Sequence, residues 1–128
     1  MASFIKKINE TVALLAKGQY DKAADISRTI LRQRPNEPDA LHLLAGACHR
    51  MGDTESALRY SERAVKLNPS SADYASNLGR YYLSVGRLDQ AVTALRRAVS
   101  LNPHHALAQF NLAQAMKGHG DTEAAIQA

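Results

Sequence analysis

The 128-residue chain has no tryptophan, a single cysteine and few aromatic residues, with five tyrosines and two phenylalanines. One cysteine cannot form a disulfide within the chain, so we expect a reducing compartment and a cytoplasmic location. Cys48 lies on an apolar helix face and is predicted to be a small buried hydrophobe. No apolar run approaches the about 20 residues that a membrane-spanning helix needs.

Signatures of catalysis are also absent. The sequence has no glycine-rich phosphate loop, no metal-binding motif and no nucleophile placed beside a base. His42 and His49 share a helix face with Asp39, but seven residues of helix rise about 10 Å, so the two imidazoles do not easily converge on one zinc ion. We therefore predict no enzyme activity for this chain itself, no metal and no other cofactor.

What the sequence does contain is a period of 34 residues. The segment Asp39–Pro69 is followed by the similar segment Asp73–Pro103, and prolines stand at 35, 69 and 103. A fixed period between about 20 and 50 residues is typical of stacked supersecondary units. The positions that match between the two segments are Leu44/Leu78, Gly52/Gly86, Ala57/Ala91, Ala64/Ala98, Leu67/Leu101 and Asn68/Asn102.

Each period predicts a helix, a turn and a second helix. Apolar residues between Asp39 and Arg50 follow the spacing of one helix face. Gly52 is suited to end that helix, and Asp53 or Thr54 to cap the next one. Pro69 stops the second helix because its ring clashes with the preceding turn. Each helix pair keeps an uncovered apolar side, so the pairs are expected to stack into a solenoid.

This pattern resembles the tetratricopeptide repeat over essentially the whole chain. The residues that fill the family's first-helix places are Leu41, Leu44, Ala45 and Cys48 in one repeat and Ala75, Leu78, Gly79 and Tyr82 in the next. The family's second-helix alanines fall on Ala57 and Ala64, then on Ala91 and Ala98. The resemblance implies an all-α fold, a right-handed solenoid of stacked antiparallel helix pairs, with the first helices lining a concave groove.

We expect one domain of four repeats, at approximately 4–37 (degenerate), 38–71, 72–105 and 106–128 (truncated). In the first, an apolar helix face is predicted from Phe4, Ile5, Ile8, Val12 and Leu15. In the last, Gly120 to Glu123 match Gly52 to Glu55 in residue type, which predicts a turn at Gly120. The chain is expected to be an N-terminal piece of a longer protein. Its uncapped end would favour self-association through Leu112, Met116, Ala125 and Ile126.

The outward positions of the first helices are the candidate binding residues. They are Asp39, His42 and His49 in the second repeat, Asp73, Asn77 and Arg80 in the third, and Phe110, Asn111, Gln114 and Lys117 in the fourth; Ser76 belongs to the same set. Asn9, Asn77 and Asn111 occupy one equivalent place, which resembles the asparagine ladder of O-linked N-acetylglucosamine transferases. An amide side chain both donates to and accepts from a peptide group. Two interpretations stay open: peptide binding, or hydrogen bonding within the stack.

The predicted function is a protein–protein interaction module that binds a peptide or partner protein in the concave groove. The alternative is the N-terminal, substrate-recruiting part of a larger transferase-type enzyme. Nucleic acid is a weaker candidate, suggested by a sequence pI of about 9.4 and by the arginines of the second helices. Acidic residues such as Asp21, Glu62 and Asp89 interrupt those arginines, which is typical of a solvated face. Neither specific nucleic-acid binding nor membrane binding is expected.

Overall fold

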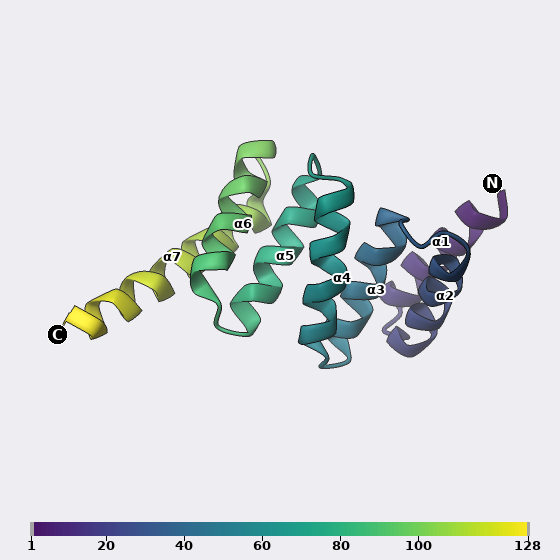
Figure 1. Cartoon of the computed structure of the whole chain (residues 1–128), viewed down its shortest axis with the longest axis horizontal. Helices are drawn as coiled ribbons and strands as arrows, with labels where there is room; N and C mark the ends of the chain where they lie inside the picture. Colours follow the sequence, from purple (N-terminus) through teal and green to yellow (C-terminus); the bar gives the residue numbers. More distant parts are fainter. Residues whose placement is uncertain (1, 128) are drawn as a thin grey trace. The chain divides into compact units, whose positions relative to one another are not determined.

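The computed structural model describes the backbone of residues 2–127 and the side chains of residues 3–121. Within this part the chain forms seven helices and no strand, which confirms the predicted all-α helical-repeat fold (Figure 1). The helices are α1 (Ala2–Ala16), α2 (Tyr20–Gln33), α3 (Pro38–Arg50), α4 (Thr54–Leu67), α5 (Ala72–Ser84), α6 (Leu88–Leu101) and α7 (Ala106–Gln127). In the described part, no helix combines the length and the apolar character needed to cross a membrane.

The helices form two compact units, residues 1–68 and residues 69–128. In the first unit α1 packs on α2, α2 on α3 and α3 on α4; in the second, α5 packs on α6 and α6 on α7. Alternate helices also touch, α1 with α3 and α5 with α7. The first helices of successive repeats therefore meet each other within each unit.

Small side chains allow the helices of each pair to pack closely. The alanines at the repeat places, Ala45, Ala57 and Ala64, are all buried, as are Leu44 and Leu58. Cys48 is buried as predicted, and this burial raises the pKa of its thiol.

The predicted turn is confirmed at Gly52. This residue has φ +89°, in the left-handed region that glycine enters without steric cost, and Gly18 and Gly86 have φ +78° at the equivalent places. Asp53 then caps α4, with its Oδ1 accepting the Ser56 N–H at 3.2 Å. The second helix, α4, ends at Leu67, and its C-cap Asn68 stands directly before Pro69.

One arginine in α4 and one in α6 each donate a hydrogen bond to the proline that precedes their repeat. Arg63 donates from Nη2 to the Pro35 carbonyl oxygen at 3.1 Å, and Arg97 donates in the same way to Pro69 at 3.2 Å. Pro35 and Pro69 lie in the turns after α2 and α4, where no helical N–H in the described part of the chain reaches their carbonyl oxygens. The arginines therefore supply hydrogen-bond donors that the backbone does not.

One prediction for the first helix is wrong. Ile5 and Val12 do not lie on the inward face of α1, since their exposed fractions are 52% and 50%. Thr11 is fully buried instead, and its hydroxyl donates to the Lys7 carbonyl oxygen at 2.8 Å. An α-helix has 3.6 residues per turn, so the inward stripe of α1 consists of Phe4, Ile8, Thr11 and Leu15. The polar hydroxyl of Thr11 is tolerated there because it donates to a carbonyl of the same helix.

The turn predicted at Gly120 is also wrong, because α7 continues without interruption to Gln127. Gly120 does not have the positive φ of Gly52, and nothing lies within 4 Å of the place where its Cβ would stand. A glycine permits the left-handed backbone of a turn but does not require it, and the unbroken backbone hydrogen bonds of α7 favour helix propagation through Gly120. Leu112 is half-buried and Met116 is exposed, whereas the side chains of Glu123, Ala125 and Ile126 lie outside the described residues.

Candidate functional site

In the second unit, α5 and α7 pack around a small alanine core. Ala75, Ala98 and Ala108 form this core, with Val99 against it. Asn111 follows Ala108 by three residues and lies on the same buried stripe of α7 as Ala115. Only 7% of Asn111 is exposed, so its amide lies in the packed face of α7 instead of on the open surface that the sequence predicted.

Buried polar atoms on α5 and α7 include Ser76 Oγ, Arg80 Nε and Asn111 Nδ2, for which no hydrogen-bond partner is found among the described residues. Ser76 was predicted to be outward-facing but is 2% exposed, since it adjoins Ala75 in the packed face. Leaving a buried donor unsatisfied costs about 1–3 kcal/mol, so an arrangement of this kind favours a ligand that supplies acceptors.

The three equivalent asparagines are not equivalent in burial. Asn9 is exposed, Asn77 is half-buried and Asn111 is buried. The regular place in the repeat was therefore predictable from the sequence, but the depth of each amide depends on the neighbouring helix.

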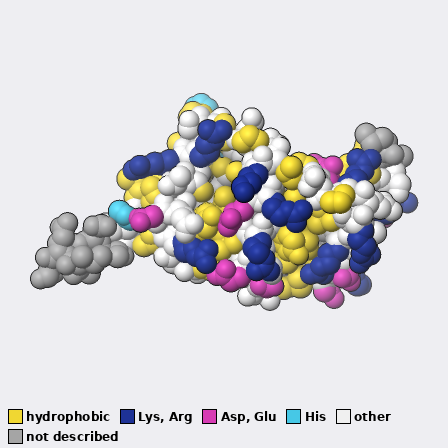
Figure 2. Space-filling view, viewed as in Figure 1, with side chains coloured by type: hydrophobic (Ala, Val, Ile, Leu, Met, Phe, Trp, Pro, Cys, Tyr) yellow, Lys and Arg dark blue, Asp and Glu magenta, His cyan; other side chains and the backbone are white. Residues whose placement is uncertain are grey.

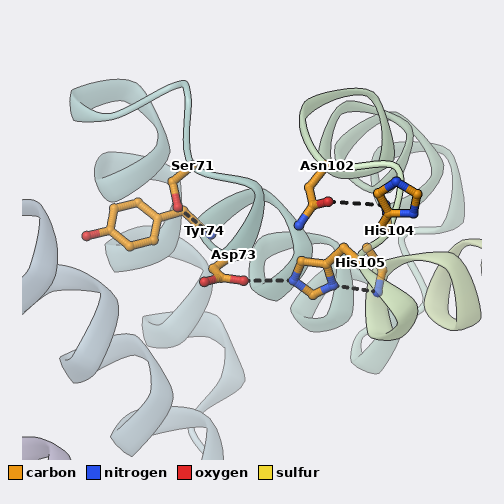
Figure 3. Close-up of polar contacts among 7 residues, drawn as sticks. Ser71, Asp73, Tyr74, Asn102, His104 and His105 are labelled. Carbon is orange, nitrogen blue, oxygen red and sulfur yellow. Dashed lines mark hydrogen bonds and ion pairs between the residues drawn. The ribbon is translucent and has the colours of Figure 1, made fainter.

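Asp73 contacts the beginning of α7. Its Oδ1 lies 2.7 Å from His105 Nε2, while His105 Nδ1 accepts the Ala108 N–H at 3.1 Å (Figure 3). Because Nδ1 accepts, the proton of the neutral ring is assigned to Nε2, which donates to the carboxylate. His105 thus accepts a hydrogen bond in the first turn of α7. The His104 backbone N–H donates to Asn102 Oδ1 at 3.1 Å in the preceding turn.

The remaining predicted residues of α7 lie on its exposed surface. Phe110 is 60% exposed, and Gln114 and Lys117 are exposed beside it. Phe110 thus presents an apolar ring beside a lysine on the exposed surface of α7.

In the first unit the predicted residues are more dispersed. Asp39 is exposed and His42 is half-buried, whereas His49 Nδ1 lies 3.2 Å from Thr54 Oγ1 at the turn before α4. The neighbouring Arg50 packs over the Tyr20 ring, 5.0 Å from its centroid. Among residues with described side chains, no three His, Cys, Asp or Glu are grouped so as to hold a metal ion.

Sequence reasoning missed a hollow of about 410 Å³ between α2 and α4. The residues that line it are Arg28, Leu31, Arg32, Pro35, Leu44, Tyr60 and Arg63. The spacing of Arg28 and Arg32, four residues apart on one helix face, was the available signal. Its convergence with Arg63 depends on the packing of α4 against α2–α3 and was not predictable.

Two family models match the chain. The model described as "Anaphase-promoting complex, cyclosome, subunit 3" matches residues 16–98, and the model described as "Tetratricopeptide repeat" matches residues 76–128. The chain is a tetratricopeptide-repeat protein. The anaphase-promoting complex subunit 3 model covers more than half of the sequence, so the chain also belongs to that repeat family.

Known proteins resemble this tetratricopeptide-repeat chain in sequence and in fold. It is 33% identical over 83 residues to a UDP-N-acetylglucosamine–peptide N-acetylglucosaminyltransferase of Caenorhabditis elegans, covering 64% of this chain and 7% of that protein. The Sgt2 TPR domain from Aspergillus fumigatus superposes with a TM-score of 0.91 at 21% identity, covering 96% of this chain and 83% of that one. The first TPR of Spaghetti (RPAP3), bound to the HSP90 peptide SRMEEVD, superposes with a TM-score of 0.86 at 21% identity, covering 91% and 93%.

Proposed function

We propose that this chain is a protein-interaction module that holds an extended segment of a partner protein against α5 and α7. The observation that carries the proposal is the set of unpartnered buried polar atoms on these two helices, Ser76 Oγ, Arg80 Nε and Asn111 Nδ2. A peptide backbone presents a carbonyl acceptor at every residue, which suits donors that lack one. The RPAP3 neighbour, solved with a bound peptide, supports this assignment.

Each residue of the proposed site has a distinct role. Asn77 and Asn111 bind the peptide backbone through their amides, without selecting its side chains. Arg80 and Lys117 select acidic side chains, and Asp73 selects a basic one with the carboxylate oxygen that His105 does not use. Phe110 and Gln114 contact the flanking residues. Asp39, His42 and His49 are the corresponding candidates on α3 of the first unit.

The test uses peptides selected from a random displayed library on the full chain. We expect Asn77→Ala with Asn111→Ala to raise the dissociation constant of every selected peptide. The rise should be about fivefold or more, because two net hydrogen bonds contribute about 1–3 kcal/mol. Binding is measured by fluorescence anisotropy, and the melting temperature is measured by circular dichroism.

Two controls make this test decisive. N-methylation of single peptide amides identifies the backbone groups that the protein binds, and the exposed substitution Asn9→Ala should leave affinity unchanged. A large fall in melting temperature with unchanged peptide affinity would contradict the proposal and assign the two amides to packing.

A second candidate function is substrate recruitment within a larger transferase. The matched transferase of C. elegans favours it, although this chain spans only 7% of the length of that relative. On this proposal the repeats hold the acceptor peptide for a separate catalytic domain. Sequencing the transcript beyond the codon for Ala128 tests it: a nucleotide-sugar-binding domain in frame supports the idea, and a stop codon excludes it.

A further inference from the structure

The hollow between α2 and α4 lies in the first unit and combines basic and apolar lining. Arg28 and Arg32 come from α2 and Arg63 from α4, while Leu31, Tyr60 and the buried Leu44 provide apolar surface. Figure 2 shows Lys and Arg side chains interspersed with hydrophobic ones over this region of the molecule, where α2 and α4 are labelled in Figure 1.

The charges of the hollow are only weakly neutralised from within. No acidic residue lines it. Arg28 forms an ion pair with Asp25 at 3.6 Å, but both side chains are substantially exposed, and such pairs contribute little. Arg63 is fixed by its hydrogen bond to the Pro35 carbonyl oxygen. Among the described residues no ion pair involves Arg32, so its guanidinium group is available, while Arg28 holds only the exposed contact with Asp25 and Arg63 is held in position.

We propose that this hollow docks an acidic segment of a partner protein, one that carries an apolar or aromatic side chain between its carboxylates. Planar guanidinium groups bind carboxylates through two parallel hydrogen bonds, and Arg28 and Arg32 lie one helical turn apart. The apolar side chain of the segment packs on Leu31, Leu44 and Tyr60. This docking site is separate from the proposed α5–α7 site and does not depend on it.

Phosphates of a nucleic acid are the competing source of negative charge, and the surroundings disfavour them. A nucleic acid carries a charge at every nucleotide and would place phosphates beside Asp25 and Glu62 as well as beside the arginines, whereas a peptide can place its few carboxylates at the arginines alone. Single strands also need a row of aromatic rings for stacking, and Tyr60 is the one aromatic residue that lines the hollow.

The experiment measures fluorescence anisotropy of defined probes with the full chain. The first probe is a short peptide with Asp and Glu on both sides of a Leu-Phe pair, and the second has Asn and Gln in place of the acids. We expect the acidic peptide alone to bind, more weakly at higher salt. Arg28→Ala with Arg32→Ala should reduce its affinity at least tenfold.

A matched pair of variants separates the site from net charge. Arg59→Ala with Lys66→Ala removes the same charge from α4 outside the hollow and should reduce affinity much less. Equal binding of the neutral peptide, or equal loss with the control pair, would overturn the proposal. So would an oligouridine strand that displaces the acidic peptide and binds more tightly, which would assign the hollow to nucleic acid.

Discussion

Asp53 is a single exposed residue on which the beginning of α4 depends. Its carboxylate accepts a hydrogen bond from the Ser56 side chain and from the Ser56 N–H, and these bonds hold the pKa of the Asp53 carboxyl below its ordinary value. Because the folded pKa is lower than the unfolded one, the stabilisation is fully present above about pH 4 and is lost as the pH falls through the folded pKa.

Asp53→Asn is therefore expected to flatten the acid side of the stability curve. Asparagine caps a helix about as well as aspartate but does not titrate, so the variant should lose less stability than the natural chain on moving from neutral to acidic pH. Urea unfolding followed by circular dichroism at several pH values measures the difference. Glu10→Gln, an exposed acid in α1, is the control. Parallel curves for the natural chain and Asp53→Asn would show that the cap contributes nothing to acid sensitivity.

Burial of individual polar residues was the least predictable property at this scale. The sequence correctly placed Asn111 at the asparagine position of its repeat, yet it also predicted outward exposure for Asn111 and Ser76, which are both buried. The number of neighbours around a helical residue depends on how the next repeat packs, and the period alone does not contain that information.

The pairing of α5 with α6 depends on Gly79. A Cβ placed on Gly79 would meet the Leu95 side chain, with Leu95 Cδ2 only 2.7 Å away, and Leu95 is fully buried. The equivalent places hold Ala45 with Ser61 in the second repeat and Thr11 with Ser27 in the first, all buried. A larger residue on the first helix thus accompanies a smaller residue on the second.

Gly79→Ala should destabilise the chain by about 1–3 kcal/mol because the added methyl group overpacks the helix interface. The same substitution should cost less in a Leu95→Ala background, since the space vacated by leucine accommodates the methyl group. The free energies of unfolding of the two single variants and the double variant form the cycle that measures this coupling. Additive effects would mean that Gly79 and Leu95 do not compete for space.

The helix bounds show which elements the 34-residue period predicted and which it did not. Every helix from α1 to α6 was predicted in its place, because glycine and proline give each turn a local cause. The same reasoning predicted a turn at Gly120, which does not form. A glycine permits a turn but does not enforce one, and the turns at Gly52 and Gly86 are each followed by a full second helix that packs back on the first.

At the scale of the whole molecule, the exposed apolar surface of α7 is the feature that concerns assembly. A hollow of about 340 Å³ lies between α6 and α7, lined in part by Val92 and Met116, and Met116 is 48% exposed. Unpaired apolar faces of repeat proteins favour association unless a polar capping helix covers them.

We therefore predict that the chain self-associates reversibly as its concentration rises, and that Met116→Glu shifts the equilibrium toward monomer. Light scattering coupled to size-exclusion chromatography gives the molar mass at each concentration. Ile5→Glu, at a similarly exposed apolar residue of α1, is the matched control and should not change the mass. A constant monomer mass over the whole accessible range would exclude association through this end.

The contacts of Arg63 with Pro35 and of Arg97 with Pro69 join residues 28 positions apart in both cases. Each of these arginines thus donates to the proline carbonyl oxygen at the end of the previous repeat. Donor and acceptor therefore recur with the same 34-residue period as the repeats, so inserting or removing one whole period would keep this contact in register.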